Sequence, residues 1–148
     1  MEIMTRDFGE IEINEEDIIE FPQAVPGFPE DKEFVLFPIG EDSPFIVLQS
    51  VNTAELAFIT IEPGNYLKGY EFEISDELAK KLKIEKNEDL LVLSIATIKG
   101  EIENMTINLA APVIINLKEK LGKQVILDKE DYPVKYRLFA DTEKELVE

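Results

Sequence analysis

The residues of this chain that could carry chemistry are almost all carboxylates. The sequence has 32 Asp and Glu against 15 Lys and Arg, and several acids are adjacent, as in Glu15–Glu16–Asp17 and Glu130–Asp131. Two carboxylates facing each other across a cleft could act as acid and base in a hydrolase. Neighbours in a turn rarely achieve that geometry, and none of these runs has the alternating oxygen ligands and glycine of a calcium loop. We therefore expect solvated surface acids and no metal or cofactor.

Two absent residue types exclude other enzyme classes. The chain contains no cysteine and no histidine. Thiolate chemistry, serine–histidine chemistry and sites that need imidazole or thiolate ligands are therefore impossible within it. No phosphate-binding glycine motif is present either. We predict a protein that is not an enzyme and keep the carboxylate-dependent hydrolase only as an alternative.

The formal charge of −17 indicates what the chain can bind. Phosphates and anionic lipids would be repelled, so we expect neither direct nucleic-acid binding nor membrane binding. A basic protein partner would be attracted and steered toward the surface. Two aromatic residues in predicted loops, Phe28 and Tyr66, are the best candidates for an exposed contact.

The elements that must position these residues are short strands separated by turns. Alternation at 9–14, a hairpin-like pair at 34–39 and 44–51, and further runs at 57–63 and 70–75 all favour strands. Residues 90–98 are apolar on nearly both faces and predict a central strand. Residues 123–128 and 134–139 predict two more strands, although Gly122–Lys123 by itself has the form of a turn.

One helix is expected, over residues 75–84, where Ser75 is a suitable N-cap residue. Three prolines between residues 22 and 29 predict an ordered loop with a type II turn at Pro26–Gly27. We therefore predict a mainly β, single-domain antiparallel barrel or sandwich over residues 1–140. A charged C-terminal tail would follow at 141–148. The start lacks the pattern of a signal peptide and no apolar run could span a membrane, so a cytoplasmic protein is expected.

The stretch from Met105 to Asn116, "MTINLAAPVIIN", combines an alternating half with an apolar half. Pro112 cannot donate to a strand ladder, so it predicts an edge, a strand start or a bulge. Asn108 and Asn116 are expected first to satisfy turns or edges, and second to contact a partner. Pro112, Val113 and Ile114 form either a buried wall or part of a contact surface.

Several segments together resemble the flagellar assembly factor FliW family. They occur in the family's order over about residues 3 to 138 and are "FGEIEI", "FPQAVPGF", "FVLFPI", "SPFIVLQSV", "LAFITIEP", "YEFEIS", "MTINLAAPVIIN", "GKQVILD" and "DYPVKYRL". The resemblance implies a cytoplasmic protein that binds flagellin. It also implies binding to CsrA, a dimeric RNA-binding repressor of flagellin translation, in competition with flagellin. Free factor would then capture CsrA and relieve repression.

On this basis we expect a protein-binding surface on a protein that is monomeric alone. The expected contacts are Phe28, Tyr66, Asn108, Pro112, Val113 and Ile114, with Glu12, Glu15 and Glu16 supplying negative charge. A generic acidic mimic of nucleic acid is a further alternative. It would lose its affinity at high salt, whereas apolar docking would persist.

Overall fold

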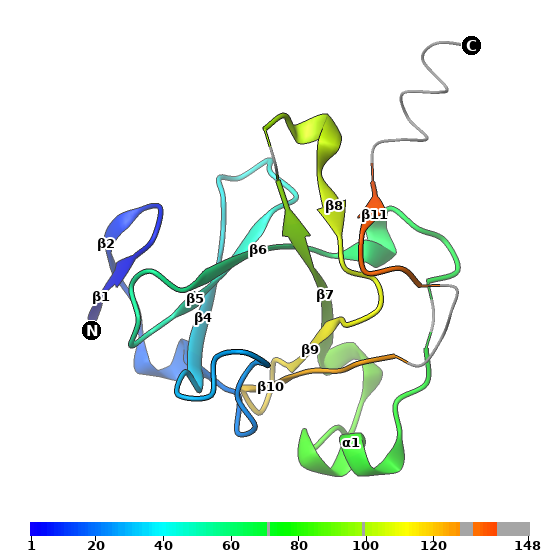
Figure 1. Cartoon of the computed structure of the whole chain (residues 1–148). Helices are drawn as coiled ribbons and strands as arrows, with labels where there is room; N and C mark the ends of the chain where they lie inside the picture. The colour runs from blue at the N-terminus through cyan, green and yellow to red at the C-terminus, as the bar shows by residue number, and fades with distance from the viewer. Residues whose placement is uncertain (71, 99, 128–131, 139–148) are drawn as a thin grey trace.

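The chain forms a mainly β structure with one short α-helix, seen in a computed structural model that describes residues 1–70, 72–98, 100–127 and 132–138 (Figure 1). The predicted fold class is confirmed. The central feature is a closed barrel, in which each strand is hydrogen-bonded to the next and the last pairs with the first. In order around the barrel its strands are β7 (Leu90–Thr97), β6 (Ala57–Ile61), β5 (Ile46–Ser50), β4 (Glu33–Pro38), β3 (Ile19–Glu20), β10 (Leu121–Gln124) and β9 (Val113–Asn116).

Strand β7 holds the barrel together because it pairs with three other strands. Its second half pairs with β6 on one side and with β8 (Thr106–Ile107) on the other. Its first half pairs with β9, and this pairing closes the barrel. A strand paired and covered in this way needs apolar residues on both faces. The prediction of a central strand at 90–98 is therefore confirmed.

The "MTINLAAPVIIN" stretch runs along β7 in two pieces, β8 and β9. Ala96 pairs with Ile107 and Leu93 pairs with Val113. Between these two pairs β7 advances by three residues, whereas the "MTINLAAPVIIN" stretch advances by six. The chain therefore bulges out of the hydrogen-bond ladder between Asn108 and Pro112. Pro112 has no N–H to donate to the ladder, which is consistent with its position in this bulge. The Asn108 Oδ1 accepts hydrogen bonds from the backbone N–H groups of Ala110 and Ala111, both at 3.0 Å. This loop therefore satisfies its own backbone.

The apolar residues form three clusters, one inside the barrel and two outside it. Barrel strands contribute alternate residues to the inner cluster, as pleating requires. A second cluster lies under residues 67–70 and 132–138, and includes β11 (Tyr136–Arg137) paired with β8. The third lies under the helix α1 (Asp76–Lys81). The buried members of the inner cluster are Ile19, Phe21, Val25, Phe34, Leu48, Leu56, Leu93, Val113 and Ile115.

Helix α1 begins where the sequence predicts. The Ser75 hydroxyl accepts a hydrogen bond from the Leu78 N–H at 3.1 Å, the expected N-cap interaction. Leu78 and Leu82 pack on Ile114 of β9. The buried Asn116 side chain fixes the other end, because its Nδ2 donates to the carbonyls of Leu82 and Lys83 at 2.8 and 3.1 Å.

A separate two-stranded hairpin, β1 (Glu2–Thr5) and β2 (Gly9–Glu12), stands beside the barrel (Figure 1). An isolated hairpin is marginal in water, so contacts with the barrel must hold it. The Arg6 N–H donates to Gln49 Oε1 at 3.1 Å, and the Arg6 Nη1 donates to the Ala57 carbonyl at 2.8 Å. The Phe8 ring packs edge-on against Phe37, with centroids 5.5 Å apart.

The proline-rich loop before β4 is ordered as predicted. Gly27 has φ +92°, and the Phe28 N–H donates to the Val25 carbonyl at 2.9 Å, as a type II turn requires. Four short 3-10 helices complete the described elements. They are η1 (Glu15–Asp17), η2 (Pro63–Asn65), η3 (Asn87–Asp89) and η4 (Ile102–Asn104).

Two local predictions are wrong. The described part of 70–75 forms no strand: the Tyr70 ring joins the second cluster, whereas Phe72 and Ile74 join the third, so no shared face exists. Gly122 and Lys123 do not form a turn but lie within β10, which begins two residues before the predicted strand 123–128 and ends at Gln124. The predicted tail at 141–148 lies outside the described residues.

Among the residues that the structure describes, no helix has the length and apolar character needed to cross a bilayer.

Candidate protein-binding surface

The acidic side chains that the structure describes are exposed or half-buried, with no sheltered pair suited to acid–base catalysis. No Asp or Glu among the described residues is buried, and no group of three or more of them is placed to hold a metal ion. A hydrolase of the carboxylate type needs two acids in a sheltered cleft with raised pKa values. The only described carboxyl whose pKa is clearly raised is that of Glu10, and this side chain lies on the open hairpin.

The raised pKa of Glu10 results first from a hydrogen bond with Glu2 on the same face of the hairpin. Glu2 and Glu12 lie directly opposite each other in the β1–β2 register, and Glu10 lies opposite Met4. A side-chain hydrogen bond with Glu2, aided by slight desolvation, raises the pKa of Glu10 because one carboxyl of the pair must keep its proton to donate. Like charges opposite each other destabilise a sheet, so these acids do not contribute to the stability of the fold.

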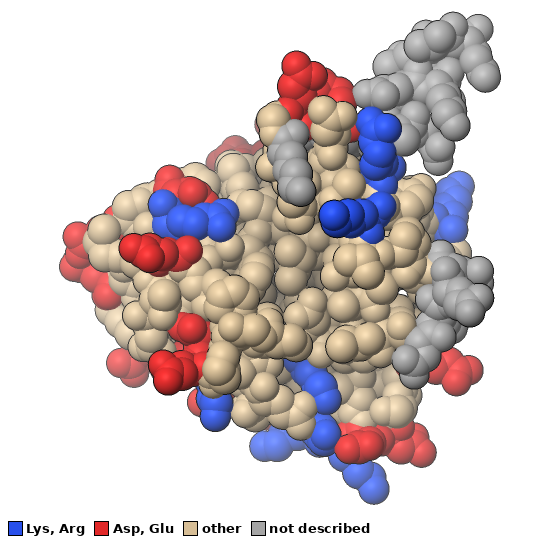
Figure 2. Space-filling model, in the orientation of Figure 1, with Lys and Arg blue, Asp and Glu red and all other residues tan. Residues whose placement is uncertain are grey.

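The predicted acids continue this negative surface. Glu12, Glu15 and Glu16 are all exposed, Glu12 at the end of β2 and the other two in η1. Figure 2 shows acidic side chains gathered over the β1–β2 side of the molecule, whereas the middle of the same face is nearly free of charge. We call Glu2, Glu10, Glu12, Glu15 and Glu16 the acidic hairpin surface.

A groove of about 640 Å³ lies next to this hairpin and contains Phe28. Most of its lining is apolar and comes from β6 and from the end of β7. Arg6, in the hairpin turn, forms part of its wall, so the groove adjoins the hairpin directly. We call it the Phe28 groove, and it is lined by Arg6, Phe28, Glu55, Leu56, Ala57, Phe58, Ile59, Ile95, Ala96, Thr97 and Ile98.

A chain of aromatic rings connects this groove with the barrel interior. Phe28, which is 38% exposed, packs edge-on against Phe58 with centroids 5.7 Å apart. Phe58 lies 6.3 Å from Phe34, and Phe34 lies 5.1 Å from Phe21. The last two rings are fully buried. A surface anchor supported in this way is rigid, so a partner that covers it loses little side-chain entropy from it.

The structure does not bring the other predicted contacts to this groove. Tyr66 is 44% exposed, but it follows η2, in the part of the chain that packs near β11 and away from the hairpin. Asn108 is half-buried and caps its own loop. Pro112, Val113 and Ile114 are buried, the last two completely, so their side chains lie in the protein interior and offer no surface.

The sequence missed three parts of this surface. Ile98, which is 44% exposed, falls within the predicted central strand 90–98, and nothing in its local sequence pattern distinguishes it from buried neighbours. Phe58 follows the strand periodicity of core residues, and only the Phe28 loop folding over it makes it part of a groove. Arg6 lies in a turn, and its role depends on the distant Ala57 carbonyl.

Comparisons with known proteins agree with this architecture. The family model described as FliW protein matches residues 2–138. A flagellar assembly factor FliW from Geobacillus kaustophilus is 47% identical over 141 residues, covering 95% of this chain and 97% of that protein. One from Clostridium novyi is 43% identical and covers 95% and 99%. A crystal structure of the flagellar assembly factor FliW superposes with a TM-score of 0.88 at 43% identity, covering 93% of this chain and 96% of the other.

These matches extend over nearly the whole chain in sequence and in fold. They agree with a chain that has no histidine, no cysteine and no sheltered acid pair among its described residues. The chain therefore belongs to the FliW family, a family of flagellar assembly factors and not of enzymes.

Proposed function

We propose that this chain acts in the cytoplasm, binds flagellin and, when free of flagellin, binds the RNA-binding repressor CsrA. Capture of CsrA would relieve repression of flagellin synthesis. The observation that carries the proposal is the position of the Phe28 groove, an exposed apolar groove that adjoins the acidic hairpin through the turn residue Arg6. Family membership supports a role in flagellar assembly, and the surface supports protein binding.

The two parts of the surface have different physical roles. The rings of Phe28 and Phe58, with Ile98, offer an apolar patch for docking, and such clustered anchors dominate binding free energies. The acidic hairpin surface attracts a basic partner and raises its association rate at low salt. A protein that binds RNA needs Lys and Arg for the phosphates, so CsrA fits this charge. The same acids would repel RNA that approaches a bound CsrA.

The proposal is tested by mixing the purified chain with purified flagellin and with CsrA, and measuring both affinities by calorimetry. Phe28→Ser should weaken the binding of at least one partner by tenfold or more. Tyr66→Ser is the matched control, because Tyr66 is a similarly exposed aromatic residue outside the groove. If neither partner binds the wild-type chain at micromolar concentration, the proposed function is wrong. If only the Tyr66 variant is impaired, the surface is wrongly placed.

A generic acidic mimic of nucleic acid is the second candidate, supported by the net charge alone. The two candidates differ in their salt dependence. A mimic should lose nearly all affinity between 50 and 500 mM salt, because exposed charges are screened. Docking through the Phe28 groove should leave measurable CsrA binding at the higher salt concentration, since apolar contacts persist.

A further inference from the structure

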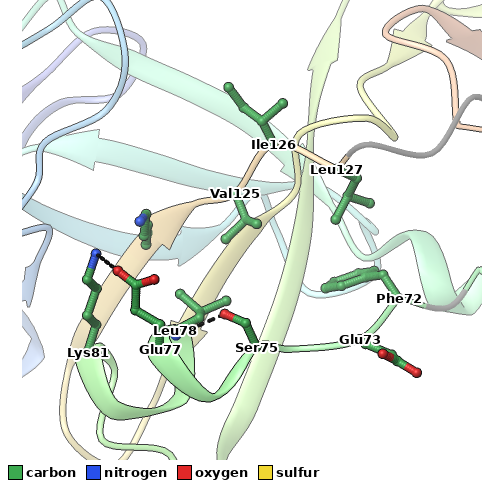
Figure 3. Close-up of a pocket in the computed structure, with 10 residues that line it drawn as sticks. Phe72, Glu73, Ser75, Glu77, Leu78, Lys81, Val125, Ile126 and Leu127 are labelled. Atoms are coloured by element: carbon green, nitrogen blue, oxygen red, sulfur yellow. Dashed lines mark hydrogen bonds and ion pairs between the residues drawn. The ribbon is translucent and has the colours of Figure 1, made fainter.

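A second groove, distinct from the Phe28 groove, lies between helix α1 and the end of β10 (Figure 3). It has a volume of about 720 Å³, within the range of ligand-binding clefts. Its apolar lining comes from Phe72 and Leu78 on the helix side and from 125–127 on the strand side. Ile126 is 72% exposed, a high value for a large apolar residue.

The strand side of this groove has one paired edge and one open edge. Toward β9, the Val125 N–H donates to the Pro112 carbonyl at 2.9 Å, and the Leu127 N–H donates to the Ala110 carbonyl at 2.7 Å. Alternate residues of a strand direct their backbone groups to opposite sides. The N–H and C=O groups of Gln124 and Ile126 therefore point away from β9.

Among the described residues, no strand pairs with that other side beyond the start of β10. Leu121 pairs with Glu20 of β3, and the Glu20 N–H donates to the Lys120 carbonyl at 2.9 Å. The next residue that could face β10 is Pro22, which has no N–H to donate. The Ala24 N–H donates to the Phe21 carbonyl at 2.8 Å, so the chain turns after β3. Within the described residues, no backbone partner occurs for Gln124 or Ile126 on this side.

This open edge lacks the protection that strand edges normally carry. Exposed edges are usually blocked by proline, by charge or by a bulge, because unpaired backbone groups invite another strand. Residues 124–127 are Gln-Val-Ile-Leu, with neither proline nor charge, and the sequence pattern predicts a strand over 123–128. Val125 and Leu127 point toward the α1 side and Ile126 points the other way, as in a strand ready for pairing (Figure 3).

The charge at this groove differs from that of the acidic hairpin surface. Its lining has two acids, Glu73 and Glu77, and two lysines, Lys81 and Lys123, in a chain of net charge −17. The Lys81 Nζ lies 3.1 Å from a Glu77 carboxylate oxygen. Lys123 forms no ion pair within the described residues. Its charge adds to the larger effect of Lys81 in lowering the pKa of Glu77, so the two lysines can attract a further acidic side chain. A basic RNA-binding protein would gain less here than at the hairpin.

We propose that the open edge at 124–126 accepts an extended segment of flagellin as an added β-strand. The segment pairs with the backbone of Gln124 and Ile126, directs an apolar side chain into the groove beside Leu78, and places an acidic residue near Lys123. At about 3.3 Å per residue the pairing extends over about 10 Å. This inference depends on the proposed function, because that proposal makes flagellin a partner.

The test combines a backbone variant with amide exchange, using purified flagellin as the probe. Ile126→Pro removes the outward N–H without touching the hydrogen bonds to β9. It should weaken flagellin binding about tenfold, whereas Ile126→Ala, which keeps the N–H, should weaken it less. Val134→Ala, at an exposed position of similar character in the 132–138 segment, should leave the affinity unchanged. Each variant is checked for folding by its thermal unfolding curve.

Amide exchange in the wild-type chain provides the second readout, which does not require that the variants fold. The amides of Gln124 and Ile126 should exchange at least tenfold more slowly when flagellin is bound. If flagellin binds but neither amide is protected, or if Ile126→Pro binds normally, the edge inference is wrong and the proposed function stands. Protection by CsrA but not by flagellin would overturn the stated occupant. If wild type binds no flagellin, the proposed function itself fails.

Discussion

The ring of Phe21 occupies the space that a side chain at position 122 would need. A Cβ atom built on Gly122 would lie 2.6 Å from Cζ of Phe21, closer than real Cβ contacts. Phe21 is fully buried in the inner cluster, where β3 and β10 meet. A glycine in the middle of a strand usually weakens it, but here it permits this close approach.

Gly122→Ala should therefore destabilise the barrel. The added methyl group must displace a buried ring, and overpacking of this kind costs about 1–3 kcal/mol. Gly64→Ala is the control, because nothing lies within 4 Å of its Cβ position and its φ is not positive. Urea unfolding of both variants measures the difference. Equal free energies of unfolding would show that the Phe21 ring can move aside.

The two asparagines of the "MTINLAAPVIIN" stretch should differ in their effect on stability. Asn116 is buried, donates to the carbonyls of Leu82 and Lys83, and accepts from the N–H groups of Lys118 and Glu119. Asn116→Ala leaves several buried groups unpaired and should lower the free energy of unfolding by about 2–3 kcal/mol.

Asn108→Ala should cost less, about 1 kcal/mol, because Asn108 is half-buried and water can replace its two accepted hydrogen bonds. We also expect this variant to bind flagellin and CsrA as wild type does, since Asn108 serves its own loop. Thermal unfolding and calorimetric titration test the two statements separately. If a normally folded Asn108→Ala protein binds either partner more weakly, Asn108 contacts that partner.

The Tyr70 hydroxyl should lose its proton only at a pH well above that of an ordinary tyrosine. Desolvation, with a smaller effect of the neighbouring Tyr132, raises its pKa to about 12. Its hydroxyl donates to the Leu109 carbonyl at 2.7 Å, and the two rings lie 4.7 Å apart. Because the folded pKa exceeds the ordinary value of 10.0, this residue's contribution to stability is complete below pH 10 and is lost as the pH rises through 12.

Ultraviolet difference spectra of phenolate formation measure this titration, with Tyr70→Phe identifying the late component. The same variant should lower the free energy of unfolding at pH 7 by about 1 kcal/mol, through the lost hydrogen bond. If the late component persists in Tyr70→Phe, the assignment is wrong.

Replacement of Glu10 should raise the stability of the fold but slow the association with CsrA. The raised pKa of Glu10 means that its protonated form suits the fold, so its stabilising contribution is present at acid pH and lost as the pH rises through the folded pKa. Glu10→Gln should therefore raise the melting temperature at pH 7, with the gain shrinking at low pH. The same change should slow CsrA association at low salt. Glu55→Gln, an exposed acid in the Phe28 groove outside the hairpin, serves as the comparison for melting temperature.

Local features of this protein could be predicted because their causes are local. Each depends on residues only a few positions apart in the sequence. Examples are the alternation of the hairpin β1–β2, the Ser75 cap of α1 and the Pro26–Gly27 turn. The apolar run of β7 likewise indicates a central strand, because burial on both faces leaves no polar positions. The family resemblance rests on the same segments.

The candidate surface could be predicted only in part. Phe28 and the acids of the hairpin lie in exposed segments, and their positions follow from turn and strand patterns. From sequence alone, the apolar residues 112–114 could have been buried or could have formed part of a contact surface. The β7–β9 pairing and the packing of α1 over β9 bury them in the protein interior. Segment 70–75 alternates like a strand, but its aromatic residues divide between two clusters that only the fold defines.

Only the tertiary structure closes the barrel, and the reason is physical. The β7–β9 pairing places Leu90 opposite Asn116, and its register is offset by three residues from that of the β7–β8 pairing. No sequence period encodes this offset. Other non-local contacts pair 124–126 along one edge only and place Arg6 against Ala57 beside Phe28. The sequence determined most of the strand segments and where charge accumulates. Non-local pairing decided the remaining strand bounds and which faces are left for a partner.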